Sequence, residues 1–350
     1  MAYTTIDDPS EYFNTVLYTG NGSTNAITNS ANAGNFQPDW VWIKARSFVE
    51  SHMLYDSSRG VTKDLRSDGA NAENTNSSGL TSFDTNGFSL GSLQNVNNNT
   101  STYVAWQWKA NGGTTSSNSD GSITSTVQAN TTAGFSIVTF TGNATAGQTV
   151  GHGLGVKPEF IFAKNRSNGN NWNCYVEATD NTGDHTLTLN GTGARSNSFN
   201  MWNDTAPTTS LITLGNRNET NGSSHNMVFL CFNSVKGYSK FGSYTGNGSS
   251  DGTFIYTGFK PAWFLAKRTN DSSHWTMLDT TRNPFNLAEN YFHANETNAE
   301  NNNNQKADFL SNGIKLRSSS RHNDSGSTFI YMAFAEHPFV SSEGVPVTAR

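Results

Sequence analysis

A pattern that occurs three times along the chain constrains its fold more than any other feature of the sequence. A Thr-Gly-Asn segment at 19–21 recurs at 141–143 and at 245–247. Each copy is followed by a proline, then by an apolar run that ends in lysine, and finally by a second aromatic run. Markers that keep both their order and their spacing indicate duplicated structural units. The pattern predicts three tandem copies of one β-sandwich unit.

The markers also divide the chain into segments. The proline and lysine pairs that bracket the first apolar run of each copy are Pro38 and Lys44, Pro158 and Lys164, and Pro261 and Lys267. The expected organisation is an N-terminal extension (1–11), repeat 1 (12–112), a Gly/Ser/Thr-rich flexible linker (113–133), repeat 2 (134–236), repeat 3 (237–341) and a C-terminal tail (342–350).

The apolar run of each copy has the pattern of a central strand. In the first copy Trp40, Trp42 and Lys44 share one face, and Val41 and Ile43 share the other. A strand that is apolar on both faces is covered on both sides. Proline is expected at the first strand position, where its missing N–H costs no ladder bond. The lysine is expected to lay its stem on the aromatic rings and its ammonium in solvent; a catalytic lysine in each copy is the alternative.

Glycine and asparagine mark the turns between these strands. The repeated Thr-Gly-Asn segment is interpreted as a tight turn, because a phosphate-binding loop needs a following helix and a P-loop lysine that are missing here. Asn86-Gly87 and Asn312-Gly313 stand between apolar flanks. Asn-Gly in that setting is the strongest short-range signal for a β-hairpin. We expect one further strand pair at each of these two positions.

Composition narrows the function classes. Charged residues make up 14% of the chain and the net charge is -5, with no run of basic residues, which argues against nucleic-acid binding. No apolar stretch approaches the roughly 20 residues that cross a bilayer, so no membrane insertion is expected. Cys174 and Cys231 each lie in an apolar run. They are interpreted as small buried thiols, with a disulfide between them as the alternative.

An acidic residue and an arginine recur three positions apart in two of the copies. Asp56 and Arg59 in repeat 1 match Asp279 and Arg282 in repeat 3, whereas repeat 2 has no such arginine. The favoured interpretation is a structural turn closed by an internal ion pair. A functional anion-binding site is the alternative.

The sequence predicts neither a catalytic residue nor a metal or cofactor site. The eight histidines are spread along the chain, and no two have the spacing of a zinc motif. No nucleophile elbow or calcium loop is complete. The one candidate binding group is Trp202, Asn203 and Asp204, since a tryptophan beside polar side chains can stack on and hydrogen-bond a sugar. Packing of Trp202 in the core is the alternative, and the favoured one.

Several segments resemble a family of structural proteins from marine tailed phages, often described as tail-fibre-like or concanavalin-like. The resemblance is carried by residues 3–13, 38–46, 54–63, 86–91 and 103–109, and by the ending 342–350. It covers nearly the whole chain and is best in repeat 1. Repeat 2 lacks the Asp-Ser-Ser-Arg motif and repeat 3 lacks the closing tryptophan pair. The resemblance implies an all-β fold of three lectin-like (jelly-roll-like) antiparallel sandwiches, and no catalytic residues.

The same resemblance implies a place in the virion. The leading hypothesis is a tail fibre, spike or other tail-appendage component that binds host-surface carbohydrate or another receptor. The alternatives are a capsid decoration or cement protein and, less favoured, a glycan-degrading enzyme. Expected partners are other virion proteins and host glycan, and further copies of the chain in a homo-oligomer, with a trimer favoured.

Overall fold

The computed structural model describes residues 2–29, 35–179 and 181–346, and antiparallel strands form nearly all of its regular structure. The fold is therefore all-β, as predicted. The helical elements in the described residues are single turns. They are η1 (Pro9–Glu11), α1 (Gln94–Asn97), η2 (Glu177–Thr179), α2 (Phe199–Trp202), α3 (Asn218–Asn221) and η3 (Arg321–Asn323). None of the described helices is long and apolar enough to span a membrane.

Three large sheets contain the strands that the repeated markers predict. The first has the order β1-β9-β3-β4, with bounds Phe13–Thr19, Thr102–Trp108, Trp40–Ala45 and Met53–Asp56. The second contains the order β12-β19-β14-β15, with bounds Phe135–Thr141, Asn226–Phe232, Phe160–Asn165 and Asn173–Val176. The third has the order β20-β27-β22-β23, with bounds Ser239–Thr245, Thr328–Pro338, Phe259–Arg268 and Thr276–Asp279. One strand order thus recurs three times.

Additional strands extend the second and third large sheets. The second continues through β10 (Ser116–Asn118) and β11 (Ser125–Asn130) on one side, and through β16 (His185–Thr188) and β17 (Ser196–Asn197) on the other. The third continues through β24 (Phe292–His293).

A smaller sheet accompanies each large one. Their strand orders are β2-β8-β7 (Asn25–Thr28, Gly87–Leu90, Leu80–Asp84), β13-β18 (Gln148–Gly151, Leu211–Leu214) and β21-β26-β25 (Phe254–Tyr256, Gly313–Leu316, Ala307–Leu310). A separate pair joins β5 (Lys63–Asp64) to β6 (Asn74–Thr75). The two predicted Asn-Gly hairpins are confirmed as β7–β8 and β25–β26. We call residues 13–108, 116–232 and 239–338 the first, second and third lobes.

The alternation of the central strands creates one shared core and three outer cores. In β3, Trp40 and Trp42 belong to the shared core, whereas Val41 and Ile43 belong to the core between the sheets of the first lobe. Equivalent residues of β14 and β22 divide in the same way between the shared core and the outer cores of the second and third lobes. The prediction of a strand covered on both faces is therefore confirmed.

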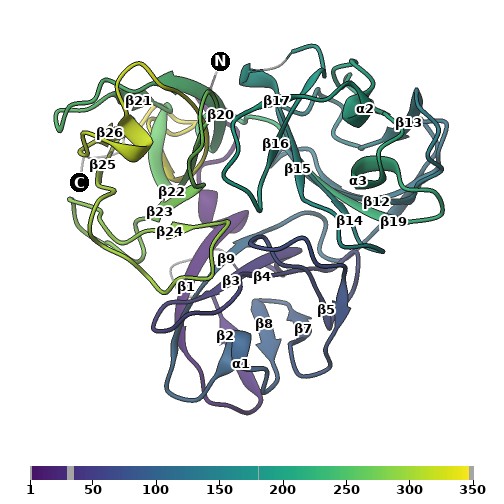
Figure 1. The fold of residues 1–350 in the computed structure, drawn as a ribbon. Coiled ribbons are helices and arrows are strands. Elements are labelled where there is room, and N and C mark those ends of the chain that lie inside the picture. Colours follow the sequence, from purple (N-terminus) through teal and green to yellow (C-terminus); the bar gives the residue numbers. More distant parts are fainter. Residues whose placement is uncertain (1, 30–34, 180, 347–350) are drawn as a thin grey trace.

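The shared core lies where the three lobes meet (Figure 1). Aromatic side chains from every lobe pack there edge to face or stacked. Trp108 of the first lobe, for example, contacts Trp263 and Phe334 of the third, and Trp40 contacts Phe232 of the second. Such rings bury a large area each and favour these geometries. The three lobes therefore form a ring around one aromatic centre.

Each seam of the ring is closed by hydrogen bonds at equivalent positions. A ring N–H at the start of the fourth strand of each lobe donates to a carbonyl of a neighbouring lobe. These bonds are His52 to His293 (3.1 Å), Trp172 to Arg66 (2.8 Å) and Trp275 to Thr188 (2.9 Å). A backbone N–H also crosses each seam, from Glu73 to Arg166 (2.8 Å), Arg195 to Thr269 (2.7 Å) and Glu300 to Arg46 (2.9 Å).

Two expectations about the backbone are wrong. The segment 113–133 is not a flexible linker, because β10 and β11 lie within it, β10 pairs with β11, and β11 pairs with β12. Its first residue is also fixed, since the amide of Gly113, like that of the preceding Gly112, donates to the buried carboxylate of Asp39. Pro261 does not open its strand: it lies inside β22, at a β-bulge where its missing N–H is tolerated. Pro38 and Pro158 do precede β3 and β14.

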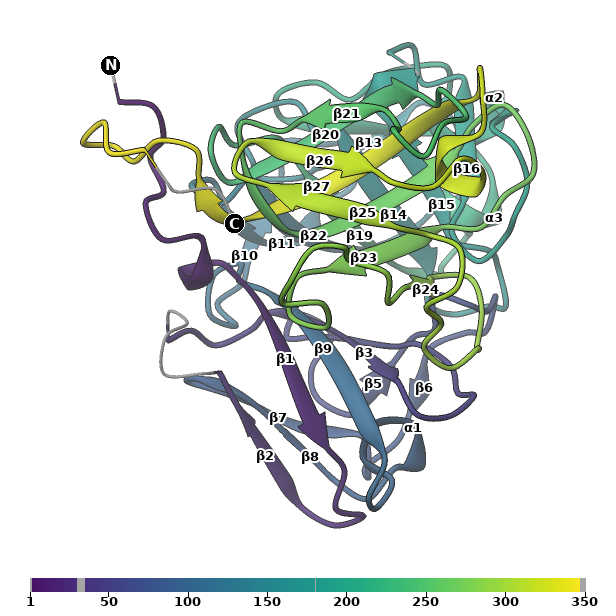
Figure 2. The ribbon, with the colours of Figure 1, turned by 90° about the vertical axis from the view of Figure 1, so that its left-hand side faces the viewer.

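The segments that precede the first lobe and follow the third lie together. The backbone N–H of Ser342 donates to Asp7 over 2.6 Å, and the ring of Tyr3 meets that of Phe339 edge to face. Figure 2 shows both end segments on the same side of the ring. The resemblance at 347–350 lies outside the described residues.

Candidate functional site

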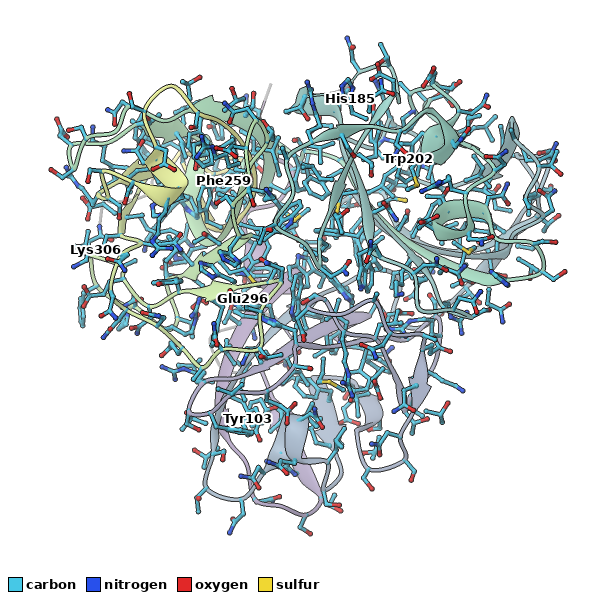
Figure 3. The ribbon with its side chains drawn as sticks, in the orientation of Figure 1. Tyr103, His185, Trp202, Phe259, Glu296 and Lys306 are labelled. Atoms are coloured by element: carbon cyan, nitrogen blue, oxygen red, sulfur yellow. The ribbon has the colours of Figure 1, made fainter. Side chains whose placement is uncertain are left out.

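Trp202 does not offer a surface for stacking a sugar. The side chain is 1% exposed and packs in the outer core of the second lobe against Tyr175 and Phe229. Figure 3 shows it inside that lobe. Asn203 and Asp204 follow α2 in a left-handed turn, with φ of 55° and 43°. The binding hypothesis for this group is wrong for Trp202, because the short helix that carries it turns its apolar side to the core.

The two Asp–Arg pairs are internal ion pairs, as predicted. The guanidinium of Arg59 contacts Asp56, and that of Arg282 contacts Asp279 at 2.5 Å; both arginines are almost fully buried. Each arginine has a second acidic partner, Glu73 at 3.1 Å and Glu300 at 3.2 Å.

Those second partners link the pairs to neighbouring lobes. Glu73 also binds Arg166 of the second lobe, at 2.8 Å, and Glu300 also binds Arg46 of the first, at 2.8 Å. The arginines hold the pKa of each glutamate below its usual range, against the effect of burial. These charges are satisfied within the protein, which favours the structural interpretation over an anion site.

The three marker lysines are completely buried, so the expectation that their ammonium groups reach solvent is wrong. They lie at the seams of the ring and donate to backbone carbonyls there. Lys164 donates to Ala70 of the first lobe (3.0 Å), Lys267 to Thr192 of the second (3.1 Å), and Lys44 to Ala45 (2.9 Å). Lys44 also lies over the ring of Phe292 of the third lobe. Their role is to join the lobes.

A groove at the boundary of the second and third lobes is the best candidate for ligand binding. Its volume is about 830 Å³, within the range of small-molecule sites. The N-terminal segment contributes Tyr3 to its wall. The lining residues are Tyr3, Glu159, Glu177, Ala178, Ser234, Lys236, Ser239, Lys240, Phe241, Tyr256, Thr257 and Gly258.

Aromatic rings and lysines form one side of the groove. Tyr256 ends β21 and is 50% exposed, which is unusual for so large a ring. The ammonium of Lys240 lies 5.1 Å from the centre of that ring and donates to the Tyr256 carbonyl at 2.9 Å. Lys236 lies 4.3 Å from the ring centre of Tyr3, whose hydroxyl donates to Gly258 over 2.7 Å. Burial and the hydrogen bond with Tyr256 raise the pKa of Tyr3 to about 12.

Two carboxylates lie side by side on the other wall. Glu159 precedes β14 and Glu177 follows β15, and the N–H of Glu177 donates to the carbonyl of Glu159 (2.9 Å). Lys157 binds Glu177 at 2.6 Å, and the hydroxyl of Ser234 donates to Glu159. Burial raises the pKa of Glu159, with a smaller contribution from Glu177. The groove therefore combines ring faces with hydrogen-bond acceptors and donors, which is the chemistry that holds a polyhydroxylated ligand.

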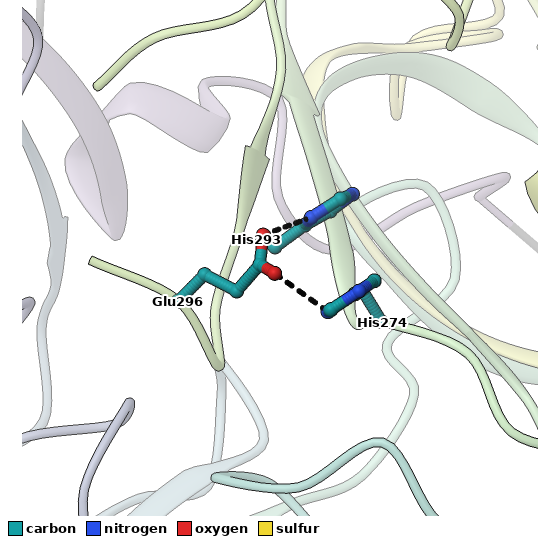
Figure 4. A group of neighbouring side chains, drawn as sticks. All are labelled: His274, His293 and Glu296. Carbon is teal, nitrogen blue, oxygen red and sulfur yellow. Dashed lines mark hydrogen bonds and ion pairs between the residues drawn. The ribbon is translucent and has the colours of Figure 1, made fainter. Parts of the chain in front are cut away.

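A second group of chemically active side chains lies in the third lobe. His274, His293 and Glu296 each place a possible ligand atom within 4.8 Å of the others (Figure 4). The sequence expectation of no metal site did not consider this group. The distance along the chain concealed this group, because His274 comes before β23, whereas His293 ends β24 and Glu296 follows it.

The groove was likewise not predicted from the sequence. Its residues come from the N-terminal segment, from the ends of β14 and β15, and from β20 and β21, and no motif connects them. The one available signal was the alternation at 254–256. Ile255 faces the core, so Phe254 and Tyr256, on either side of it, are expected on the opposite, outer face of the strand.

The antiparallel sheets of the chain place it among all-β proteins of β-sandwich-like architecture. A family model described as "Domain of unknown function (DUF7483)" matches residues 8–338, nearly the whole chain, so the protein belongs to that family. Comparison with curated proteins and comparison with solved structures gave no match.

Proposed function

We propose that the protein is a structural component of a tailed-phage virion, in a tail fibre, spike or other appendage, and that it binds host-surface carbohydrate in the groove. The groove carries the binding part of this proposal, because a half-exposed tyrosine and two carboxylates line the same cavity. The place in the virion rests on the resemblance to tailed-phage structural proteins. The three lobes are, on this proposal, tandem copies of one lectin-like sandwich.

The arrangement of the carboxylates favours binding over hydrolysis. Glycosidases place two carboxyl groups on either side of the scissile bond. Glu159 and Glu177 are instead neighbours beside the paired ends of β14 and β15, joined by a backbone hydrogen bond. Both can accept hydrogen bonds from sugar hydroxyls.

The first prediction concerns Tyr256. The full chain is applied to an array of bacterial surface polysaccharides, and affinity for the best ligand is measured by calorimetry. Replacing Tyr256→Ala removes the stacking surface and is expected to weaken binding about fivefold or more, because ring stacking contributes on the order of 1 kcal/mol or more. Tyr256→Phe keeps the ring and is expected to retain most of the affinity.

Phe254→Ala is the matched control. Phe254 lies two positions away on the same strand and is 42% exposed, but it does not line the groove. Its loss is expected to leave binding unchanged. Equal binding by Tyr256→Ala and the parent chain would remove the groove from the proposal. Release of new reducing ends would favour the enzyme alternative, and labelling confined to the capsid of the intact particle would favour a decoration protein.

A further inference from the structure

The geometry points to a zinc site formed by His274, His293 and Glu296 at the seam between the first and third lobes. Nδ1 of His293 lies 2.6 Å from one carboxylate oxygen of Glu296, and Nδ1 of His274 lies 3.3 Å from the other. Two imidazoles and one carboxylate are a ligand set that zinc accepts, with a fourth position left for water. The inference is independent of the groove.

The hydrogen bonds of His274 identify Nδ1 as its accepting nitrogen. The side-chain oxygen of Asn295 accepts the backbone N–H of Trp275 (2.9 Å), which turns the amide nitrogen of Asn295 toward Nδ1 of His274 (3.0 Å). An amide nitrogen only donates, so Nδ1 is the unprotonated, accepting atom. Nδ1 has one lone pair, so a zinc ion that binds it replaces the hydrogen bond from Asn295.

The partners of Gln305 identify the protonated nitrogen of His293. The side-chain oxygen of Gln305 accepts the hydroxyl of Thr276 and lies 3.0 Å from Nδ1 of His322.

The side-chain nitrogen of Gln305 therefore lies 2.6 Å from Nε2 of His293 and donates to it. Nε2 of His293 is thus the accepting nitrogen, and its Nδ1 carries the proton that faces Glu296. A zinc ion that binds Nδ1 displaces this proton, so uptake is accompanied by proton release.

The two histidine rings differ in burial and lie in a stack. The side chain of His293 is 9% exposed, whereas those of His274 and Glu296 are 32% and 28% exposed. The two rings lie parallel, with centres 4.4 Å apart. Ligand lone pairs lie in the ring plane, so ligation requires the more exposed ring of His274 to rotate out of this stack.

The group lies at the seam between the first and third lobes, so a metal bound there affects how these lobes are held together. The ring of His52, in the first lobe, donates to the carbonyl of His293. The backbone N–H of Glu50 donates to the carbonyl of Thr297. Figure 3 shows Glu296 where these two lobes meet. This seam joins the segments that are furthest apart in the chain. A bound metal is therefore expected to stabilise ring closure, since a ligand that binds only the folded state raises its stability.

The test measures uptake of Zn²⁺ by the full chain in calorimetry, together with the visible spectrum of Co²⁺ bound in its place. We expect one equivalent per chain and a higher melting temperature with Zn²⁺ than with a chelator. His274→Ala and Glu296→Gln are expected to weaken uptake at least tenfold and to abolish the melting shift. Both side chains are partly exposed, and circular dichroism of the metal-free variants checks their fold.

His337→Ala is the control, because His337 is also in the third lobe and its side chain is 55% exposed. It is expected to bind Zn²⁺ like the parent chain. Uptake below one equivalent in the parent chain, or equal uptake in His274→Ala and the parent chain, would overturn the inference and leave the group as a hydrogen-bonded network.

Discussion

The three lysines that end the marked strands are buried at the seams, although an ammonium group ordinarily reaches water. Each donates hydrogen bonds to backbone carbonyls at the seam. Burial lowers the pKa of Lys44, Lys164 and Lys267 to about 8 in each case. In the unfolded chain the pKa of a lysine is about 10.4. Between these values the unfolded chain binds more protons, so each lysine adds stability as the pH rises from 8 to 10.

The prediction is a pH-dependent difference between the parent chain and Lys164→Met. Their difference in free energy of unfolding is expected to shift in favour of the parent chain by roughly 1.4 kcal/mol per pH unit between pH 8 and 10. Urea denaturation at several pH values measures it. The comparison with a variant is needed because other groups also titrate over this range. Burial raises the pKa of the thiols of Cys174 and Cys231, and this makes the folded chain less stable as the pH rises. A difference that stays constant over this range would contradict the account.

At the residue scale, the sequence predicted which faces of a strand are apolar but not what lies opposite them. The alternation of Trp40 to Ile43 was correct because it depends only on the period of two along a strand. The burial of the Lys44 ammonium depends on a neighbouring lobe. The burial of Trp202 depends on how one helical turn packs. Neither is encoded in the local pattern: the ammonium of Lys44 was misplaced, whereas the favoured core position of Trp202 is confirmed.

At the element scale, buried polar side chains hold the turns in place. Asn97, Asn221 and Asn323 lie in α1, α3 and η3 and accept the backbone N–H of the asparagine in the repeated Thr-Gly-Asn turn, over 3.0, 2.9 and 3.1 Å. All three are completely buried. Their positions recur with the repeat, yet asparagine is so common in this chain that the sequence alone did not single them out. The Asp–Arg turns were predictable because both partners lie within four residues.

The prediction at this scale concerns Arg59 and Arg282. Replacing either with alanine leaves two carboxylates without their buried partner and is expected to lower the free energy of unfolding by about 3–5 kcal/mol. Urea denaturation measures the change. Arg217→Ala, whose side chain is 50% exposed, is the control and is expected to stay within about 0.5 kcal/mol of the parent chain. Unchanged stability together with loss of a bound anion would instead support an anion site.

At the scale of the whole molecule, the repeated markers predicted three units but not how they associate. Independent sandwiches on flexible linkers and a closed ring have the same local pattern. The ring arises because the tryptophan and phenylalanine faces of β3, β14 and β22 are too apolar to remain in water and cover one another. Ring closure gives the groove and the histidine group their walls, since both lie at boundaries between lobes.

The central claim is that the three lobes share one core and so fold as one unit. Differential scanning calorimetry of the full chain tests it most directly, because the ratio of calorimetric to van't Hoff enthalpy counts cooperative units. The account predicts one endotherm with a ratio near one. Separate endotherms, or a single broad one with a ratio well above one, would show lobes that melt independently and would contradict it.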